Sequence, residues 1–182
     1  LDYKAMISDM KFGIKGIGLS YHTPTFKMDG AFYREVKESH EEYNGILNIK
    51  AGKIQVAAVG SYVKTKTFSS LFAFGYVGIP IPVHPAFNIH GLAVGFGLNR
   101  TFNLPSPVEI PEFPLIKVMN EGGLGTDTPS GFFMKLNKYV SVKENSYVIM
   151  AGVKFDTFKV VTTTAIASLT VGDDTVIGLI GI

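Results

Sequence analysis

Hydrophobic and polar residues alternate at a period of two along much of this chain, a pattern typical of β-strands with two unlike faces. The clearest case is residues 88–100, where large and small side chains alternate. If this segment is extended, one face carries Leu92, Val94, Phe96 and Leu98, and the other carries Gly91, Ala93, Gly95 and Gly97. We expect the large residues to pack in the core. The small-residue face would let a second sheet, a helix or an apolar ligand approach closely.

Five strand candidates precede this segment, at residues 10–21, 26–36, 43–49, 54–65 and 71–77. Most of the connections are short and carry Gly, Pro or charged residues, which predicts hairpins and therefore an antiparallel meander. A change in apolar parity predicts a bulge near Lys15 and Gly16. Residues 37–42 are predicted to form an exposed hairpin tip. The three prolines of residues 79–85 are predicted to break the strand pattern.

One short helix is predicted after the central strand. Residues 104–114 carry four prolines and are expected to cross an end of the sheet without regular structure, before a glycine-rich loop at 120–127. Thr128 and Pro129 then form a helix start, with Thr128 as the N-cap, and apolar residues recur at helical spacing up to Tyr139. Strands are predicted again at 147–155, 159–171 and 175–182.

These elements predict a mainly β fold in a single domain spanning residues 1–182. The sheet would be a twisted antiparallel meander that is curled or partly closed, as in a barrel or sandwich, with one short helix packed on it. One short helix cannot cover a sheet of about eight or nine strands. Part of the sheet must therefore face something else, either an apolar cavity or a neighbouring segment.

The composition supports this expectation. Hydrophobic residues make up 46% of the chain and charged residues 18%, against a usual charged fraction of about 25%. A surface so poor in charge suggests a partner surface, a membrane-facing surface, or a module of a larger protein. The chain ends on an apolar run, residues 175–182, which we interpret as the edge of a fragment or processed piece. A net charge of +2 does not favour nucleic acid as a partner.

Three segments resemble a known family: Gly91–Arg100, Phe113–Leu115 and Ala151–Phe158. In order along the chain, they are similar to the family of unknown function numbered six-six-zero-three, which occurs in very long, β-rich microbial proteins. The resemblance implies a β-rich fold and a chain that is part of something longer. It implies no activity and no site residues.

No combination of residues predicts a metal, a cofactor or a catalytic centre. The chain has no cysteine, and its histidines are His22, His40, His84 and His90. His84 and His90 could approach each other across the turn at Pro85, but no carboxylate accompanies them at a recognised ligand spacing. The pairs Glu41–Glu42 and Asp173–Asp174 are expected to be solvated turn residues. Residues 122–125 lack the Lys-Ser/Thr ending of a phosphate loop and are expected to be a flexible loop. Lys135 and Lys138 are expected on the helix face opposite its aromatic residues.

Two function hypotheses follow, with a third held as unlikely. The first is a non-enzymatic structural or binding module whose partners are the rest of a longer chain or other copies of itself. The second is a carrier of lipid or another apolar small molecule, or a membrane-active β protein, with the ligand on Gly91, Ala93, Gly95 and Gly97. The third is a hydrolase, although no nucleophile–base pair can be assembled from the sequence.

Overall fold

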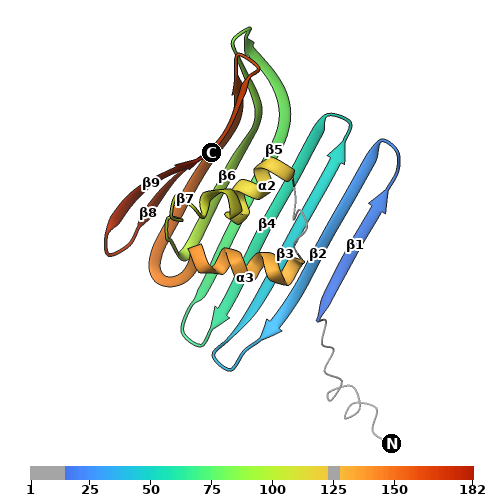
Figure 1. The fold of residues 1–182 in the computed structure, drawn as a ribbon. Helices are drawn as coiled ribbons and strands as arrows, with labels where there is room; N and C mark the ends of the chain where they lie inside the picture. Colours follow the sequence, from blue (N-terminus) through green and yellow to red (C-terminus); the bar gives the residue numbers. More distant parts are fainter. Residues whose placement is uncertain (1–14, 123–127) are drawn as a thin grey trace, which may run out of the picture.

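The computed structural model describes residues 15–122 and 128–182, and in them the chain forms one nine-stranded sheet (Figure 1). Each strand pairs antiparallel with the next one in the sequence, in the order β1 to β9. The strands are β1 (Gly16–His22), β2 (Phe26–Val36), β3 (His40–Ala51), β4 (Ile54–Thr65), β5 (Ser69–His84), β6 (Phe87–Phe102), β7 (Val140–Thr157), β8 (Val161–Val171) and β9 (Thr175–Gly181). The predicted mainly β meander is confirmed.

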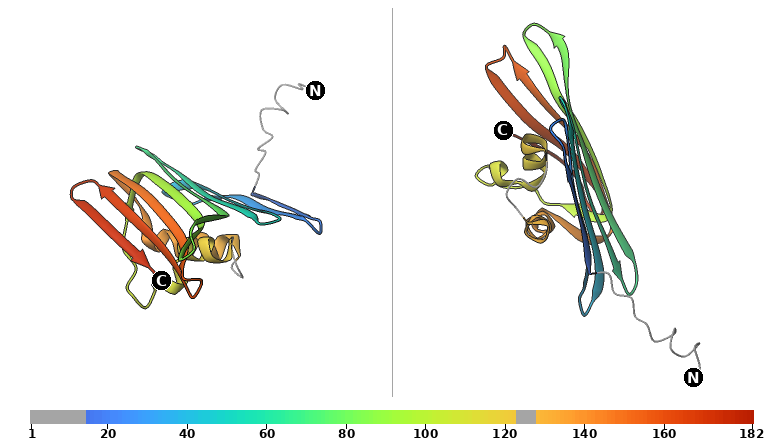
Figure 2. Two further views of the ribbon diagram at one scale, coloured as in Figure 1. Left: turned by 90° about the horizontal axis from the view of Figure 1, so that it is seen from above. Right: turned by 90° about the vertical axis from the view of Figure 1, so that its right-hand side faces the viewer.

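All helical structure in the described residues lies between β6 and β7, on one side of the sheet (Figure 2). It consists of the 3-10 helix η1 (Ile110–Glu112), helix α2 (Pro114–Glu121) and helix α3 (Pro129–Tyr139). The β8–β9 end of the sheet bends toward the helices, but β1 and β9 remain separate edges, so the sheet is curled and not closed into a barrel. No helix or further strand formed by residues 15–122 or 128–182 lies on the opposite side of the sheet.

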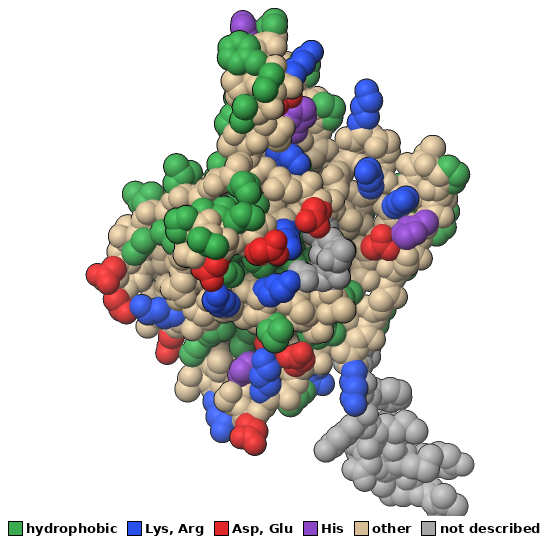
Figure 3. Space-filling view, in the orientation of Figure 1, with side chains coloured by type: hydrophobic (Ala, Val, Ile, Leu, Met, Phe, Trp, Pro, Cys, Tyr) green, Lys and Arg blue, Asp and Glu red, His purple; other side chains and the backbone are tan. Residues whose placement is uncertain are grey.

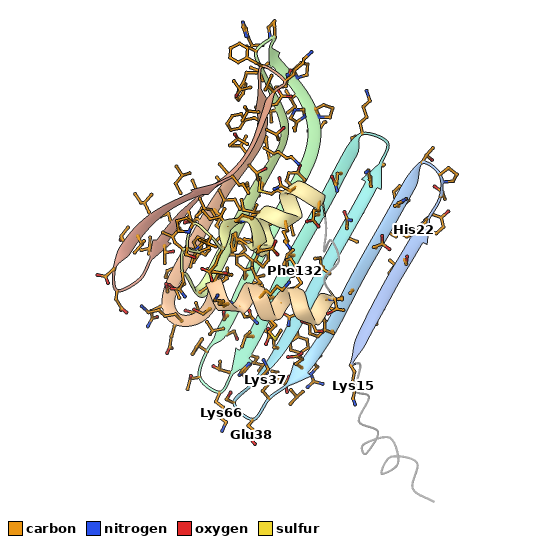
Figure 4. All side chains as sticks on the ribbon, in the orientation of Figure 1. Lys15, His22, Lys37, Glu38, Lys66 and Phe132 are labelled. Carbon is orange, nitrogen blue, oxygen red and sulfur yellow. The ribbon has the colours of Figure 1, made fainter. Side chains whose placement is uncertain are left out.

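Helix α3 begins and ends where the sequence predicts. The Thr128 side chain accepts a hydrogen bond from the Gly131 backbone N–H at 3.2 Å, and Pro129 occupies the first helical position. Phe132 is buried against the sheet (Figure 4), as are Phe133, Leu136 and Tyr139. Lys138 is exposed. The predicted separation of aromatic and basic residues on this helix is confirmed.

Helix α2 differs from the expectation from sequence, which excludes regular structure over residues 104–114 and assigns no element to residues 115–119. Pro114 is the first residue of α2, where its missing N–H is not needed. Gly122 ends the helix in the left-handed conformation, with φ of 71°. Five residues of α2 are buried: Pro114, Leu115, Ile116, Val118 and Met119. The sheet is therefore covered by two helices, where the sequence predicted one.

Strands β5 and β7 extend furthest beyond their predicted ranges. Strand β5 continues through the prolines to His84, with register shifts between Gly78 and Ile81 and between Pro82 and His84 that accommodate the missing donors. Strand β7 begins at Val140, directly after α3, instead of at residue 147. Of the predicted first strand, residues 16–21 fall in β1 and residues 10–14 lie outside the described residues, as does the bulk of the predicted 120–127 loop.

The core lies between the helices and the sheet. It is built on the sheet residues that face the helices, above all the aromatic residues of β5, which are at most 3% exposed. The main contributors are Phe72, Phe74, Tyr76, Phe113, Leu115, Phe132, Phe133, Leu136, Met150 and Ile166. Burying several aromatic side chains supplies the main stabilising free energy of the fold.

Candidate functional site

The uncovered side of the sheet, which we call the open face, is apolar from β1 to β9. Because paired residues of antiparallel strands project to the same side, the registers define rows of side chains that cross the whole sheet. One row consists of Ile17, Phe32, Gly45, Gly60, Ala73, Phe96, Ile149, Leu169 and Ile177. Four neighbouring rows of this kind contain a single charged residue, Arg34, among the residues of the nine strands.

Large apolar side chains on the open face are in contact with water. Val94 is 69% exposed and Leu179 75%. The others with exposed side chains in these rows include Ile17, Leu19, Phe32, Val77, Leu92, Phe96, Leu98, Ile149 and Ile177. The helix side contrasts with this, since Lys, Arg, Asp and Glu are scattered over it among other residues (Figure 3). Large exposed apolar patches of this kind are typical of surfaces that bind other molecules.

The relief of the open face is uneven. A shallow, widely open hollow of about 520 Å³ lies over β1–β4, floored by Gly30, Gly45, Ala58 and Gly60 and bordered by apolar side chains such as Phe32. Two strands beyond β4, strand β6 carries the large exposed side chains Leu92, Val94, Phe96 and Leu98, which we call the β6 ridge. Small residues of β5, Ala73 and Gly75, lie between them. The open face therefore presents a hollow and a ridge side by side.

The prediction that the β6 ridge packs in the core is wrong. Its four residues are 41–69% exposed, and the alternating small residues are the ones that face the helices. The predicted alternation of residues 88–100 is present, but the buried face is the one with the small residues. The small residues have a physical reason to be inside, because the aromatic side chains of β5 need space beside them.

The four predicted ligand-binding residues Gly91, Ala93, Gly95 and Gly97 lie in line on the covered face, and protein side chains fill the space above them. A Cβ at Gly91 would lie 2.4 Å from the Tyr76 ring, and one at Gly95 would lie 2.9 Å from Phe74. At Gly97 it would meet the Arg100 side chain at 2.8 Å. This geometry gives the small residues a packing role. Ligand binding there stays a prediction that would require Tyr76 and Phe74 to move.

A buried polar cluster lies on the covered face at the Gly97 end of this line, where α3 meets β3. The Glu42 carboxylate, 3% exposed, accepts hydrogen bonds from Asn44 at 3.0 Å, Asn137 at 2.9 Å and Lys37 at 3.0 Å. Asn137 belongs to α3, so Glu42 ties the helix to the sheet. The expectation that Glu42 is a solvated turn residue is therefore wrong. Its neighbour Glu41 points to the open face, where it pairs with Arg34 at 3.0 Å.

Electrostatics keep this cluster charged. Burial raises the pKa of Glu42, but the hydrogen bonds from Asn44, Asn137 and Lys37 outweigh burial, so that its pKa lies below the usual range. Arg100, 1% exposed, donates to the Ser61 hydroxyl at 2.9 Å and to the Val140 carbonyl at 3.2 Å. Burial lowers the pKa of Arg100 to about 10, and the Glu42 charge opposes this shift.

Arg100 reaches the covered face because β6 contains a bulge at Asn99. Asn99 has a positive φ of 52°, and the register with β7 shifts between Leu98 and Arg100. The Asn99 side chain holds this geometry, since it donates to the Ser69 carbonyl at 2.7 Å and accepts from the Asn145 backbone N–H at 2.8 Å. Sequence reasoning missed the bulge, although an Asn at the end of a strict alternation is a signal for it.

The histidines are dispersed. His22, labelled in Figure 4 at the far end of β1, contacts the Asp29 carboxylate at 2.9 Å. His90 contacts Asp156 at 2.6 Å, and His84 accepts a hydrogen bond from the Ala86 backbone N–H. Within residues 15–122 and 128–182, no three His, Cys, Asp or Glu side chains group as metal ligands. Neither α-helix in these residues is long and apolar enough to cross a bilayer.

Fold and surface together define an all-β module, built on a single antiparallel sheet with one face covered by helices and the other uncovered. The chain belongs to a family of unknown function (DUF6603), whose model matches residues 2–182. The resemblance carried by Gly91–Arg100 and the two later segments is thereby confirmed. A search of curated proteins and a search of solved structures returned no match.

Proposed function

We propose that this domain is a non-enzymatic binding module that docks the open face of its sheet onto a partner surface. The observation that carries the proposal is the continuous apolar surface from Ile17 on β1 to Ile177 on β9, with a single charged residue in four rows. Such a surface is stabilised when it is removed from water, by roughly 25 cal/mol for each Å² of apolar area. Its partner would be another part of a longer chain or another copy of the domain.

The covered face supports a structural role for the polar residues. The Glu42 carboxylate is held by three donors, one of them on α3, and both ends of the Arg100 guanidinium are held by Ser61 and Val140. The Asn137–Glu42 hydrogen bond fixes α3 on the sheet, and the Arg100 hydrogen bonds join β6 to β4 and β7. In this proposal the covered face holds the sheet and helices together, and the open face binds the partner.

Lysine substitutions on the open face test the proposal. We expect wild-type protein, diluted until it is monomeric, to bind the apolar dye ANS, and Val94→Lys with Ile149→Lys to abolish dye binding without lowering the melting temperature. Met134→Lys, at a position on α3 that is 74% exposed, is the control and should leave dye binding unchanged. If the lysine pair unfolds the protein, or if the dilute monomer binds no dye, the open face is not a free binding surface.

A second candidate function is the carriage of an apolar small molecule, and the hollow over β1–β4 is the observation that favours it. About 520 Å³ is within the range of small-molecule pockets, and its lining is almost wholly apolar. Native mass spectrometry tests it, since a carrier would retain an extra mass that disappears on denaturation. Gly60→Phe should remove that mass by filling the hollow, and retention of the mass in this variant would place the ligand elsewhere.

A further inference from the structure

We infer that the partner of the open face is a second copy of this domain, packed face to face so that the β6 ridge of each copy enters the hollow of the other. This inference rests on the function proposed above and names the partner. Two sheets packed in this way form a sandwich whose core is the two open faces.

The first argument is shape. The hollow is floored by Gly45, Ala58 and Gly60, and the ridge centred on Phe96 stands about two strand spacings away, roughly 10 Å. A two-fold axis between ridge and hollow places the ridge of each copy opposite the hollow of its partner. A two-fold interface requires this kind of self-complementary surface, in which each contact occurs twice.

The second argument is area. Four rows, spaced about 7 Å along the strands, across nine strands spaced about 4.8 Å, give a projected surface of roughly 1,000 Å². A stable interface needs about 800 Å² from each partner. The open face therefore has the size that a dimer requires, even if its curled β8–β9 end contributes little. Interfaces between identical subunits are also the most apolar ones, as this surface is.

The third argument is charge. Within the four rows the only charged residue of the strands is Arg34, which lies in the last row on the edge-side strand β2 and pairs with Glu41 at 3.0 Å. Two identical surfaces repel each other when they carry unpaired like charges. The centre of the open face carries none, so nothing opposes the approach of a second copy.

A swap of ridge and hollow tests the inference. Gly60→Phe places a ring in the hollow, at a position where a Cβ meets only the Phe72 carbonyl oxygen at 3.9 Å, so the monomer can accept it. Phe96→Ala removes the centre of the ridge. We expect each single substitution to weaken the dimer at least tenfold, measured by analytical ultracentrifugation across a dilution series. The double variant should recover most of the affinity, because its filled hollow faces a truncated ridge.

Gly18→Phe is the matched control. It adds the same ring on the helix side of β1, where a Cβ meets nothing within 4 Å, and it should leave the association unchanged. Thermal melting confirms that each variant folds. A dimer insensitive to both single substitutions, or a double variant as weak as the two singles combined, would overturn the inference.

The dye experiment separates this inference from the proposal on which it rests. A chain that stays monomeric at all concentrations and binds ANS on the open face overturns the second-copy assignment, while the binding-module proposal stands with a different partner. A monomer that binds no dye overturns both. A monomer that retains a bound small molecule, seen as an extra mass in native mass spectrometry, points to the small-molecule alternative and also overturns the second-copy assignment.

Discussion

The two faces of this sheet are made by the same alternating strands, yet they differ in almost every property. On the covered face, aromatic side chains of β5 fill the space above the small residues of β6, and buried charges such as Glu42 are held by several donors. On the open face, large apolar side chains are exposed and stand around a hollow floored by glycine. The covered face is packed within the chain, whereas none of the described residues packs over the open face.

Similar substitutions on the two faces should therefore have different effects on stability and association. A change on the covered face should lower the stability of the folded monomer, because its contacts are within the chain. A change on the open face should leave the monomer stable and alter association instead. Matched pairs of substitutions, one on each face, therefore measure whether the distinction holds.

The largest difference is expected for phenylalanine. Phe74 is 2% exposed on the covered face. Phe74→Ala should lower the unfolding free energy by about 3–5 kcal/mol, because it removes buried apolar surface and leaves a cavity. Phe96 is 41% exposed, so Phe96→Ala should cost only about 1 kcal/mol in the dilute monomer. Urea unfolding at low protein concentration measures both. Equal losses would mean that the two faces are equally buried in solution.

The next difference concerns two adjacent carboxylates that point to opposite faces. Glu42→Gln should lower the unfolding free energy by about 2 kcal/mol at pH 7, because it removes charge-assisted hydrogen bonds inside the fold. Since the pKa of Glu42 is lowered in the fold, its stabilising contribution is present above the unfolded pKa of about 4.5 and is lost as the pH falls through the folded value. The variant should lack this part of the acid destabilisation.

Glu41→Gln is the control for this pair. Glu41 is paired with Arg34 on the solvent-exposed side, and its loss should leave the unfolding free energy at pH 7 unchanged within error. Unfolding curves between pH 7 and pH 3 provide the measurement for both variants. If Glu42→Gln kept the full acid dependence of the wild type, the Glu42 cluster would not be its source.

A third difference is expected for glycine. Gly91→Ala would place a methyl group 2.4 Å from the buried Tyr76 ring, so the ring must shift. This shift should lower the unfolding free energy by about 2 kcal/mol. Gly75, on the open face, has nothing within 4 Å of an added Cβ, and Gly75→Ala should be neutral or slightly stabilising. Thermal melting compares the two. A neutral Gly91→Ala would show that the space beside it is free, as the ligand-binding prediction requires.

The sequence predicts the strands and helix α3 well, because alternation and helix-start signals are local. The meander also follows from local signals, the short turns between successive strands. Which face of residues 88–100 is buried is not a local property. It depends on Phe74 and Tyr76 of β5, which need the space that Gly95 and Gly91 leave. The alternation alone predicts two unlike faces and does not indicate which of them is buried.

The missed features share a cause as well. Helix α2 starts at a proline, and proline was counted as a breaker although the first helical position accepts it. The polar cluster needs a contact between Glu42 on β3 and Asn137 on α3, which are 95 residues apart, so no spacing rule could find it. The shortage of charge in the composition did predict an exposed apolar surface, and the structure places that surface on the side without helices.

The smallest difference is expected for the isosteric exchange of valine for threonine. Val59 is 2% exposed on β4, and Val59→Thr should cost about 1–2 kcal/mol because a hydroxyl is buried in the core. Val94 is 69% exposed on the β6 ridge, so Val94→Thr should change the unfolding free energy of the dilute monomer by less than about 0.5 kcal/mol. If a partner covers the ridge, however, Val94→Thr should become destabilising as the protein concentration rises, since the hydroxyl is then buried at the interface. Melting temperatures measured over a concentration series separate these cases, because the loss from Val59→Thr must not depend on concentration.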